Sequence, residues 1–335
     1  MRRREFIAGL GATITGSIQT NAQELPSLAF VGYLDDGPAQ GFIFRQVVFR
    51  EGLAEVDYFE GCNVAIEAHR AELQEWANDL VSRGVAVLVA SASLPAILAA
   101  KAATTTIPIV FGCGADPIET GLVSSPDHPR GNITGVTSMM LGIGSKRLGL
   151  LRDLVPRATR VAVLVDPNDD ANVIKSMIAD VRGAALSIGR EIGVFFAANI
   201  GDIDDAFAGL IEKRSEVLLV SPSSFFSSQR MEIAGLAAQH RVPALYFERD
   251  FAYAGGLMSF GPNLPEFYRQ LGIYAGRILS GKKPGDLPVR TIRSEFVINL
   301  KTAKALGLTI PETLLATADE VIRLVRQEKL VRSSR

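Results

Sequence analysis

The sequence is poor in cysteine and histidine, and this scarcity limits the chemistry available to it. Among 335 residues there are only 2 cysteines and 3 histidines. Cys62, Cys113, His69, His128 and His240 show no spacing typical of a metal site, so we expect no bound metal. Because Cys62 begins one predicted strand and Cys113 follows the end of another, we expect two free thiols rather than a disulfide.

An excess of charge of one sign is also absent. The chain has 35 basic and 36 acidic residues, for a formal net charge of -1. Nucleic-acid-binding domains and proteins of anionic membrane surfaces carry basic patches that such a balance does not suggest. We therefore expect a small-molecule ligand and no nucleic acid.

A hydrophobic run long enough to span a membrane is missing as well. The apolar stretch 6–18 is too short, and it follows three arginines and precedes a polar segment, which is the pattern of an export signal. Arg3 and Arg4 favour twin-arginine export over an ordinary Sec signal. We expect cleavage after Ala22, with residues 1–22 removed, and no lipid anchor, because no cysteine lies near that point.

The sequence motifs of common enzymes do not occur. The loop after the first predicted strand lacks GxGxxG, and the chain has neither GxxxxGK[ST] nor GxSxG. The pair Gly112 and Gly114 resembles a phosphate loop, but Asp116 would repel a pyrophosphate. We expect no catalytic residues and no cofactor.

Short apolar runs alternate with amphipathic segments of helical periodicity. Continuous apolarity over four to seven residues is typical of strands covered on both faces, and strand-helix alternation is typical of parallel sheets with right-handed crossovers. Predicted strands are 28–33, 63–68, 85–91, 108–111, 160–165, 191–197, 216–221 and 243–247. Predicted helices include 40–56, 73–82, 146–154, 173–188 and 229–240.

This alternation occurs twice, which predicts an α/β protein of two Rossmann-like lobes with a parallel sheet in each. We treat 131–138 as a bridging region, and the strand 257–260 with the helix 265–279 as an excursion back to the first lobe. The predicted lobes are 27–114 plus 254–286, and 115–253 plus 287–330. Three crossings would then form the hinge between them.

Ligands of open parallel sheets bind beyond the carboxyl ends of the strands. The candidate ligand-binding residues at these ends are Asp35, Ser91, Ser93 and Asp116 in the first lobe, and Asn168, Ser221, Ser223, Phe225, Tyr246 and Glu248 in the second. The N–H groups after Ser91 and Ser221 would receive a carboxylate, Asp116 or Glu248 an ammonium, and Tyr246 and Phe225 apolar groups. Serine, aspartate and asparagine are also the ordinary caps and turn residues of such loops, so a structural role stays open.

Several segments resemble a known family. MRRREFIAGLG, LAAKAATTTIPIVFGCGADPIETGLV, RGNITGVTS and EFVINLKTAKALGLTIPETLLATADEVI are similar to the ABC transporter substrate-binding proteins of the tryptophan/tyrosine type. The resemblance implies a type I periplasmic binding fold, location in the periplasm, permease and ATPase subunits as partners, and no catalysis. We expect a monomer. A ligand sensor that signals to a membrane receptor and a periplasmic enzyme remain alternatives.

The sequence departs from this family where ligand would bind. The segment 66–76 is shorter than in members of the family, and Ser223 and Ser224 stand where many members have Asp-Pro. The loop 35–38 replaces a run that is commonly rich in serine and glycine. The resemblance therefore leaves the identity of the ligand open.

Overall fold

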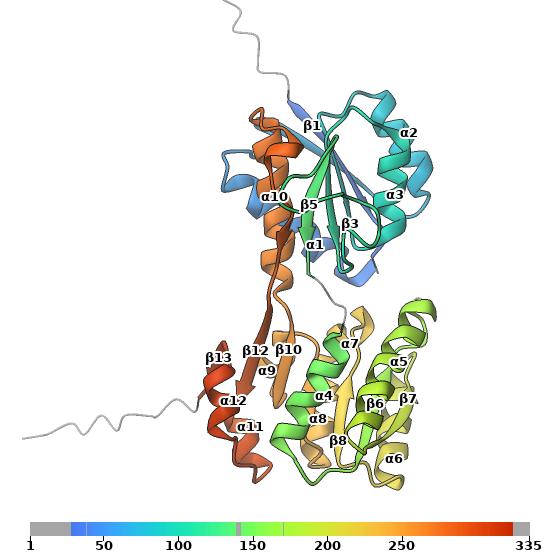
Figure 1. Cartoon of the computed structure of the whole chain (residues 1–335), viewed down its shortest axis with the longest axis vertical. Helices are drawn as coiled ribbons and strands as arrows, with labels where there is room; N and C mark the ends of the chain where they lie inside the picture. The colour runs from blue at the N-terminus through green and yellow to red at the C-terminus, as the bar shows by residue number, and fades with distance from the viewer. Residues whose placement is uncertain (1–27, 38, 139–141, 170, 324–335) are drawn as a thin grey trace, which may run out of the picture.

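The computed structural model describes residues 28–37, 39–138, 142–169 and 171–323, which form two α/β lobes (Figure 1). The expected export signal, and its expected cleavage after Ala22, lie outside the described residues. No helix in the part of the chain that the structure describes is long and apolar enough to cross a membrane.

The first lobe is built on a six-stranded sheet in the order β11-β5-β4-β3-β1-β2, and all its pairings are parallel. The strands are β1 (Ala29–Asp35), β2 (Val64–His69), β3 (Val87–Ser91), β4 (Ile109–Cys113), β5 (Ile133–Thr137) and β11 (Arg290–Thr291). Helices α1 (Ala39–Ala54) and α10 (Leu264–Leu279) pack on one face. Helices α2 (Leu73–Ser82) and α3 (Leu94–Ala103) pack on the other.

The second lobe has a seven-stranded sheet in the order β13-β12-β10-β9-β8-β6-β7, in which only the β10–β12 pairing is antiparallel. Its strands are β6 (Arg160–Val165), β7 (Glu191–Phe196), β8 (Val217–Val220), β9 (Ala244–Tyr246), β10 (Met258–Pro262), β12 (Ser294–Asn299) and β13 (Glu320–Ile322). Helices α4 (Ile143–Leu154), α5 (Ala171–Ser187), α11 (Leu300–Ala305) and α12 (Glu312–Thr317) cover one face. Helices α6 (Ile200–Glu212), α7 (Ser224–Ser228), α8 (Arg230–Gln239) and α9 (Arg249–Tyr253) cover the other.

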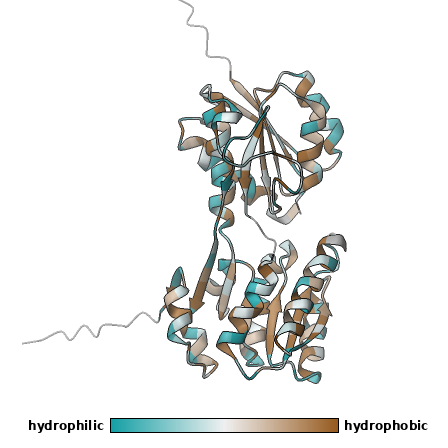
Figure 2. Ribbon diagram, viewed as in Figure 1, coloured by the Kyte–Doolittle hydropathy of each residue, from teal (hydrophilic) through white to brown (hydrophobic). Residues whose placement is uncertain are grey.

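The continuous apolar runs form strands because both faces of each sheet are covered. Every residue of β3 and of β4 is buried, and the strands form apolar layers between the helices in Figure 2. The α1–α10 pair packs unusually closely, through glycine. A Cβ at Gly52 would lie 1.9 Å from the Arg269 carbonyl oxygen, and one at Gly272 would lie 2.1 Å from the Phe49 carbonyl oxygen.

The two-lobe α/β prediction is confirmed, but three strands belong to the other lobe than expected. Strand β11, which falls in the range expected for the second lobe, pairs with β5 in the first sheet. Strand β5 pairs with β4 in the first sheet, and β10 pairs with β9 and β12 in the second. The expected boundaries at 114/115, 253/254 and 286/287 are therefore wrong. A glycine in β5 hides its strand character: a Cβ at Gly135 would lie 2.1 Å from the Phe111 carbonyl oxygen of β4. Only the five-residue helix α9 separates β9 from β10, and the chain remains in the second lobe.

The three crossings of the hinge follow β5, follow β10 and precede β12. The first leaves the carboxyl end of β5 and the second leaves the carboxyl end of β10, which runs parallel to β9. The carboxyl edges of both sheets therefore face the region between the lobes. Helices α1 and α7 come into contact there. The expectation of two free thiols is also confirmed, with Cys62 exposed and Cys113 buried.

Candidate functional site

The two sheets each contain a point at which the strand order reverses, and ligand sites of open α/β sheets lie at such points. In the first sheet β1 lies between β2 and β3, and in the second β6 lies between β7 and β8. Both points open toward the region between the lobes. We therefore take the loops after β1, β3, β6 and β8 as the candidate site.

Asp35 stands at the first of these points, where it pairs with Ser91 across the sheet. Its carboxylate is fully buried and forms an ion pair with Arg45 of α1, with Nε to Oδ2 at 2.6 Å and Nη2 to Oδ1 at 2.8 Å. The Gly37 N–H donates to Oδ1 at 2.7 Å. The charge of Asp35 is thus neutralised within the lobe.

Ser91 and Ser93 lie near the loop after β1, and their hydroxyl groups form hydrogen bonds within the first lobe. The Ser91 hydroxyl is fully buried and lies 2.8 Å from the Tyr33 hydroxyl. Burial, and then the charge of Asp35, raise the pKa of Tyr33 well above its ordinary value. Ser93 caps α3 by accepting from the Ala96 N–H, and its hydroxyl donates to Asp36 Oδ2 at 2.9 Å. The structure therefore groups these serines at the edge of the site.

Asp116 lies in the first lobe, in the loop between β4 and β5. Its Oδ1 accepts from the Ile118 N–H at 2.7 Å and from the Glu119 N–H at 3.4 Å, which is the geometry of a turn cap. The space above Gly112 is filled by α10, since a Cβ there would lie 2.9 Å from Leu271 Cδ1. Both residues thus have a structural role in their surroundings.

The second lobe repeats the strand-turn arrangement with another carboxylate, Asp166, which sequence analysis did not select. Asp166 follows β6 and is 3% exposed. It accepts from the Ser223 hydroxyl at 2.6 Å and from the Asn168 N–H at 2.9 Å. Among the described residues, no Lys or Arg forms an ion pair with it. Its charge is held by hydrogen bonds alone.

Two further carboxylates follow strands of the second lobe, Asp169 in the loop after β6 and Glu248 after β9. Burial, together with repulsion by Asp166, raises the pKa of Asp169 to about 6. Burial also raises the pKa of Glu248, which follows β9, while a hydrogen bond from Ser227 and the charge of Arg230 lower it. A cation placed among these groups would relieve unfavourable charge.

Of the other predicted ligand-binding residues of the second lobe, some lie in the loops of the site and one lies in the core. Ser221 follows β8 and is 3% exposed, and Ser223 caps α7 by accepting from the Phe225 and Phe226 N–H groups. Phe225 is half-buried in the first turn of α7. Tyr246, by contrast, lies in the core of the second lobe, where its ring stacks on Phe251 at 4.5 Å. The structure does not bring Tyr246 to the loops of the site.

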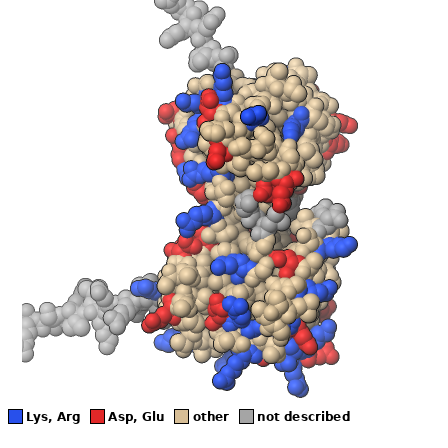
Figure 3. Space-filling view, viewed as in Figure 1, with Lys and Arg blue, Asp and Glu red and all other residues tan. Residues whose placement is uncertain are grey.

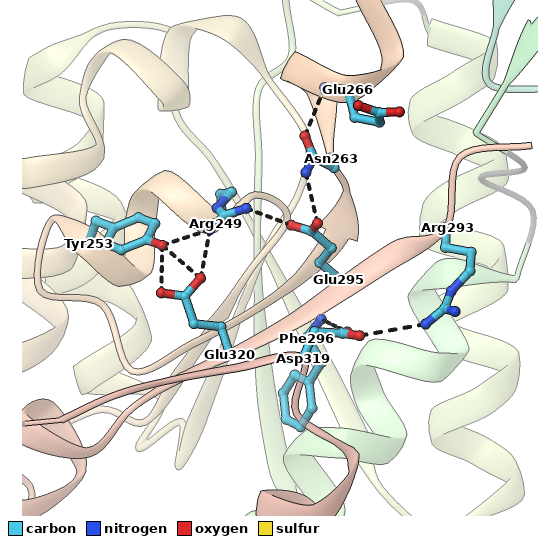
Figure 4. Close-up of polar contacts among 9 residues, drawn as sticks. All are labelled: Arg249, Tyr253, Asn263, Glu266, Arg293, Glu295, Phe296, Asp319 and Glu320. Atoms are coloured by element: carbon cyan, nitrogen blue, oxygen red, sulfur yellow. Dashed lines mark hydrogen bonds and ion pairs between the residues drawn. The ribbon is translucent and has the colours of Figure 1, made fainter. Parts of the chain in front are cut away.

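A polar network ties two of the crossings to the second lobe (Figure 4). Arg249 of α9 pairs with Glu295 at 3.0 Å and with Glu320 at 2.6 Å. Glu295 also accepts from Asn263 at 2.7 Å, so that the segment leaving β10 and the segment entering β12 share one carboxylate. Tyr253 completes the network through its hydrogen bonds to Glu320.

The first crossing has its own anchor in the second lobe. Arg147 of α4 is 2% exposed and donates to the carbonyl oxygens of Phe260 at 2.7 Å and Phe247 at 3.3 Å. Burial lowers the pKa of Arg147 to about 9. Because α4 follows the first crossing and Phe260 lies just before the second, this guanidinium joins the two.

Charged side chains of both signs are spread over the two lobes. On the face shown in Figure 3, basic and acidic side chains are mixed over both lobes, and the surface narrows between them. Within the described part of the chain, no group of three or more His, Cys, Asp or Glu could hold a metal ion.

Residues 44–322 match the family model of the ABC transporter substrate binding proteins. This chain belongs to that family. A tyrosine-binding protein of Clostridioides difficile (strain R20291) is 29% identical over 266 residues, which are 78% of this chain and 75% of that protein.

Solved structures of similar proteins support the fold. A conserved domain protein of Vibrio cholerae is 27% identical with a TM-score of 0.68, and the match covers 88% of this chain and 99% of that one. An ABC domain from Streptococcus pneumoniae in complex with L-Trp is 24% identical with a TM-score of 0.67, and the match covers 88% of this chain and 100% of that one. The fold is the type I periplasmic binding fold, which regulators of the LacI family share.

Proposed function

We propose that this protein captures a small metabolite with an amino group, of the amino-acid class, between its two lobes and delivers it to an ABC importer. The observation that carries the proposal is the difference in charge across the site. The carboxylate of the first lobe, Asp35, is neutralised by Arg45, whereas Asp166 and Asp169 in the second lobe have no ion-pair partner among the described residues. An ammonium group suits the second lobe.

Apolar side chains beside the loops favour a ligand with an aromatic or apolar part. Phe42 in the first turn of α1 and Phe225 in the first turn of α7 are both half-buried, and α1 and α7 are in contact. Ile43 and Val47 of α1 are 75% and 48% exposed. The binding of L-Trp and of tyrosine by similar proteins supports the same ligand class.

The mechanism we propose is closure of the lobes about the three crossings. A ligand held by one lobe gains contacts to the other only when the lobes close, and this differential affinity shifts the open-closed equilibrium. The closed form would be presented to permease and ATPase subunits at the membrane, with the protein in the periplasm as a monomer. No step of this cycle requires a chemical change in the ligand.

Thermal unfolding of the purified protein with a panel of amino acids, aromatic acids, nucleosides and sugars tests the proposal. A ligand that binds only the folded state stabilises it by about 2.7 kcal/mol at a hundredfold excess over its Kd. We expect stabilisation by amino acids and recovery of the ligand unchanged after incubation. Stabilisation by sugars alone, or conversion of the ligand, would contradict the proposal.

A further inference from the structure

Arg70 lies at the carboxyl edge of the first lobe, beside the loop after β1. It directly follows β2, whose last residue His69 pairs with Leu34, so Arg70 is level with Asp35. Strand β2 is the edge strand farthest from β5 and β11, which lead to the crossings. Arg70 therefore stands at the side of the site away from the hinge.

The guanidinium of Arg70 is held against the loop after β1. It donates to the Gly37 carbonyl oxygen from Nη2 at 2.9 Å and from Nε at 3.2 Å. It also lies over the Phe42 ring, with its central carbon 5.7 Å from the ring centroid. The third nitrogen, Nη1, takes part in neither of these hydrogen bonds. Its N–H groups can therefore donate to a ligand.

The turn after Arg70 is strained. Ala71 and Glu72 both have left-handed backbone conformations, with φ of 59° and 44°. A left-handed non-glycine residue costs on the order of 1–2 kcal/mol, and such strain is concentrated at functional sites. Here the strained turn links the end of β2 to α2 and fixes where Arg70 leaves the sheet.

Arg70 also lacks the acidic partner that Arg45 and Arg83 of this lobe have. Two arginines contact the loop after β1, and Arg45 forms an ion pair with Asp35. No carboxylate forms an ion pair with Arg70 among the residues that the structure describes, and the nearby Glu67 is paired with Arg83. A positioned guanidinium without an acidic partner is the group best suited to bind a carboxylate.

We propose that Arg70, held on Phe42 and the Gly37 carbonyl, binds the carboxylate of the ligand and selects carboxylate-bearing ligands over their decarboxylated counterparts. This inference rests on the proposed function and deepens it. The ligand would lie with its carboxylate toward the first lobe and its ammonium toward Asp166 and Asp169 of the second. Arg70 is a specificity-determining residue in this arrangement.

Isothermal titration of four forms of the protein with matched probes tests the inference. The probes are L-tyrosine and L-tryptophan, and the corresponding amines tyramine and tryptamine, which lack only the carboxylate. The forms are the wild type, Arg70→Gln, Arg70→Lys and Arg277→Gln. Arg277 is an exposed arginine of α10 in the same lobe, near the end of that helix that lies away from the crossing.

For Arg70→Gln we expect at least a tenfold loss of affinity for the amino acid that binds the wild type and less than a twofold change for its amine. Arg70→Lys, which keeps the charge but not the planar fork, is expected to fall between, and Arg277→Gln to match the wild type. Equal losses for amino acid and amine, or no loss for either, would overturn the role of Arg70.

Two further outcomes separate this inference from the proposed function. If the wild type binds the amines as tightly as the amino acids, the proposed ligand-binding function stands but the role of Arg70 is contradicted. A wild type that binds none of the four probes contradicts the proposed ligand class, and with it this inference. Melting temperatures of the ligand-free variants identify any loss that comes from unfolding instead of from the site.

Discussion

The two lobes use the same turn after their first strand and give its carboxylate different partners. Asp35 ends β1 and accepts from the Gly37 N–H, and Asp166 follows β6 and accepts from the Asn168 N–H. Ten residues after Asp35 stands Arg45, which neutralises it, whereas ten residues after Asp166 stands Ser176. The same backbone arrangement thus yields a carboxylate that is neutralised in the first lobe and one that has no ion-pair partner among the described residues in the second.

The cap of the neighbouring helix repeats in the same way. Ser93 caps α3 and donates to Asp36, and Ser223 caps α7 and donates to Asp166, and donor and acceptor are 57 positions apart in the sequence in both cases. The first pair is exposed and the second is buried. A buried carboxylate with no cation costs more than an exposed one, which points to the second lobe as the place where an incoming cation gains most.

The largest expected effect comes from breaking the ion pair of the first lobe. Arg45→Leu leaves Asp35 buried and uncompensated, so we expect the free energy of unfolding to fall by about 3–5 kcal/mol. Urea denaturation of both proteins measures this. The double variant Asp35→Asn/Arg45→Leu is expected to recover much of the loss, and a single-variant loss below about 1 kcal/mol would contradict the role given to this pair.

Helix packing offers the next contrast between the lobes. Gly52→Ala forces a Cβ onto the Arg269 carbonyl oxygen, and we expect the free energy of unfolding to fall by about 1–3 kcal/mol. Gly183 of α5 has no atom within 4 Å of an added Cβ, so Gly183→Ala in the second lobe is expected to raise it by about 0.5–1 kcal/mol. Denaturant titrations of both variants measure these free energies of unfolding. An equal change in the two variants would show that the close approach of α1 and α10 does not affect stability.

Asp169 of the second lobe predicts a pH dependence. The pKa of Asp169 is raised to about 6 in the folded protein, from 3.8. The folded state therefore binds the proton more tightly, and this group adds stability as pH falls through about 6 toward 4. We expect the difference in melting temperature between the wild type and Asp169→Asn to change across this window.

Binding of an ammonium ligand reverses this shift, because a cation favours the charged carboxylate. Titration at pH 6 in buffers of different ionisation enthalpy is expected to show proton release by the wild type and less by Asp169→Asn. Proton uptake by the wild type, or equal release by both proteins, would place the ammonium elsewhere.

The smallest expected effect concerns the hinge. Glu295→Gln weakens the contacts to Arg249 and Asn263, but these side chains are partly exposed, and such pairs contribute only about 0–1 kcal/mol. We expect little change in stability and a measurable change in the radius of gyration of the ligand-free protein by small-angle scattering. An unchanged radius would show that this network does not set the resting angle of the lobes.

The strands and the repeated alternation could be predicted because buried parallel strands read as short apolar runs, as in 160–165, where prediction and structure coincide. Strand β5 could not, because Gly135 and two threonines dilute its pattern. Among the site residues, the positions of Ser91 and Ser223 followed from strand ends. The partners Arg45 and Arg70 did not, since which cation meets which carboxylate depends on how α1 and β2 lie in space.

The most direct test of the charge difference between the lobes is a crystal structure with the ligand that stabilises the protein most in the thermal screen. We expect closed lobes, with the ligand ammonium within hydrogen-bond distance of Asp166 or Asp169 and the ligand carboxylate on Arg70. A ligand bound between the lobes with its ammonium on the first lobe and its carboxylate on the second would contradict it.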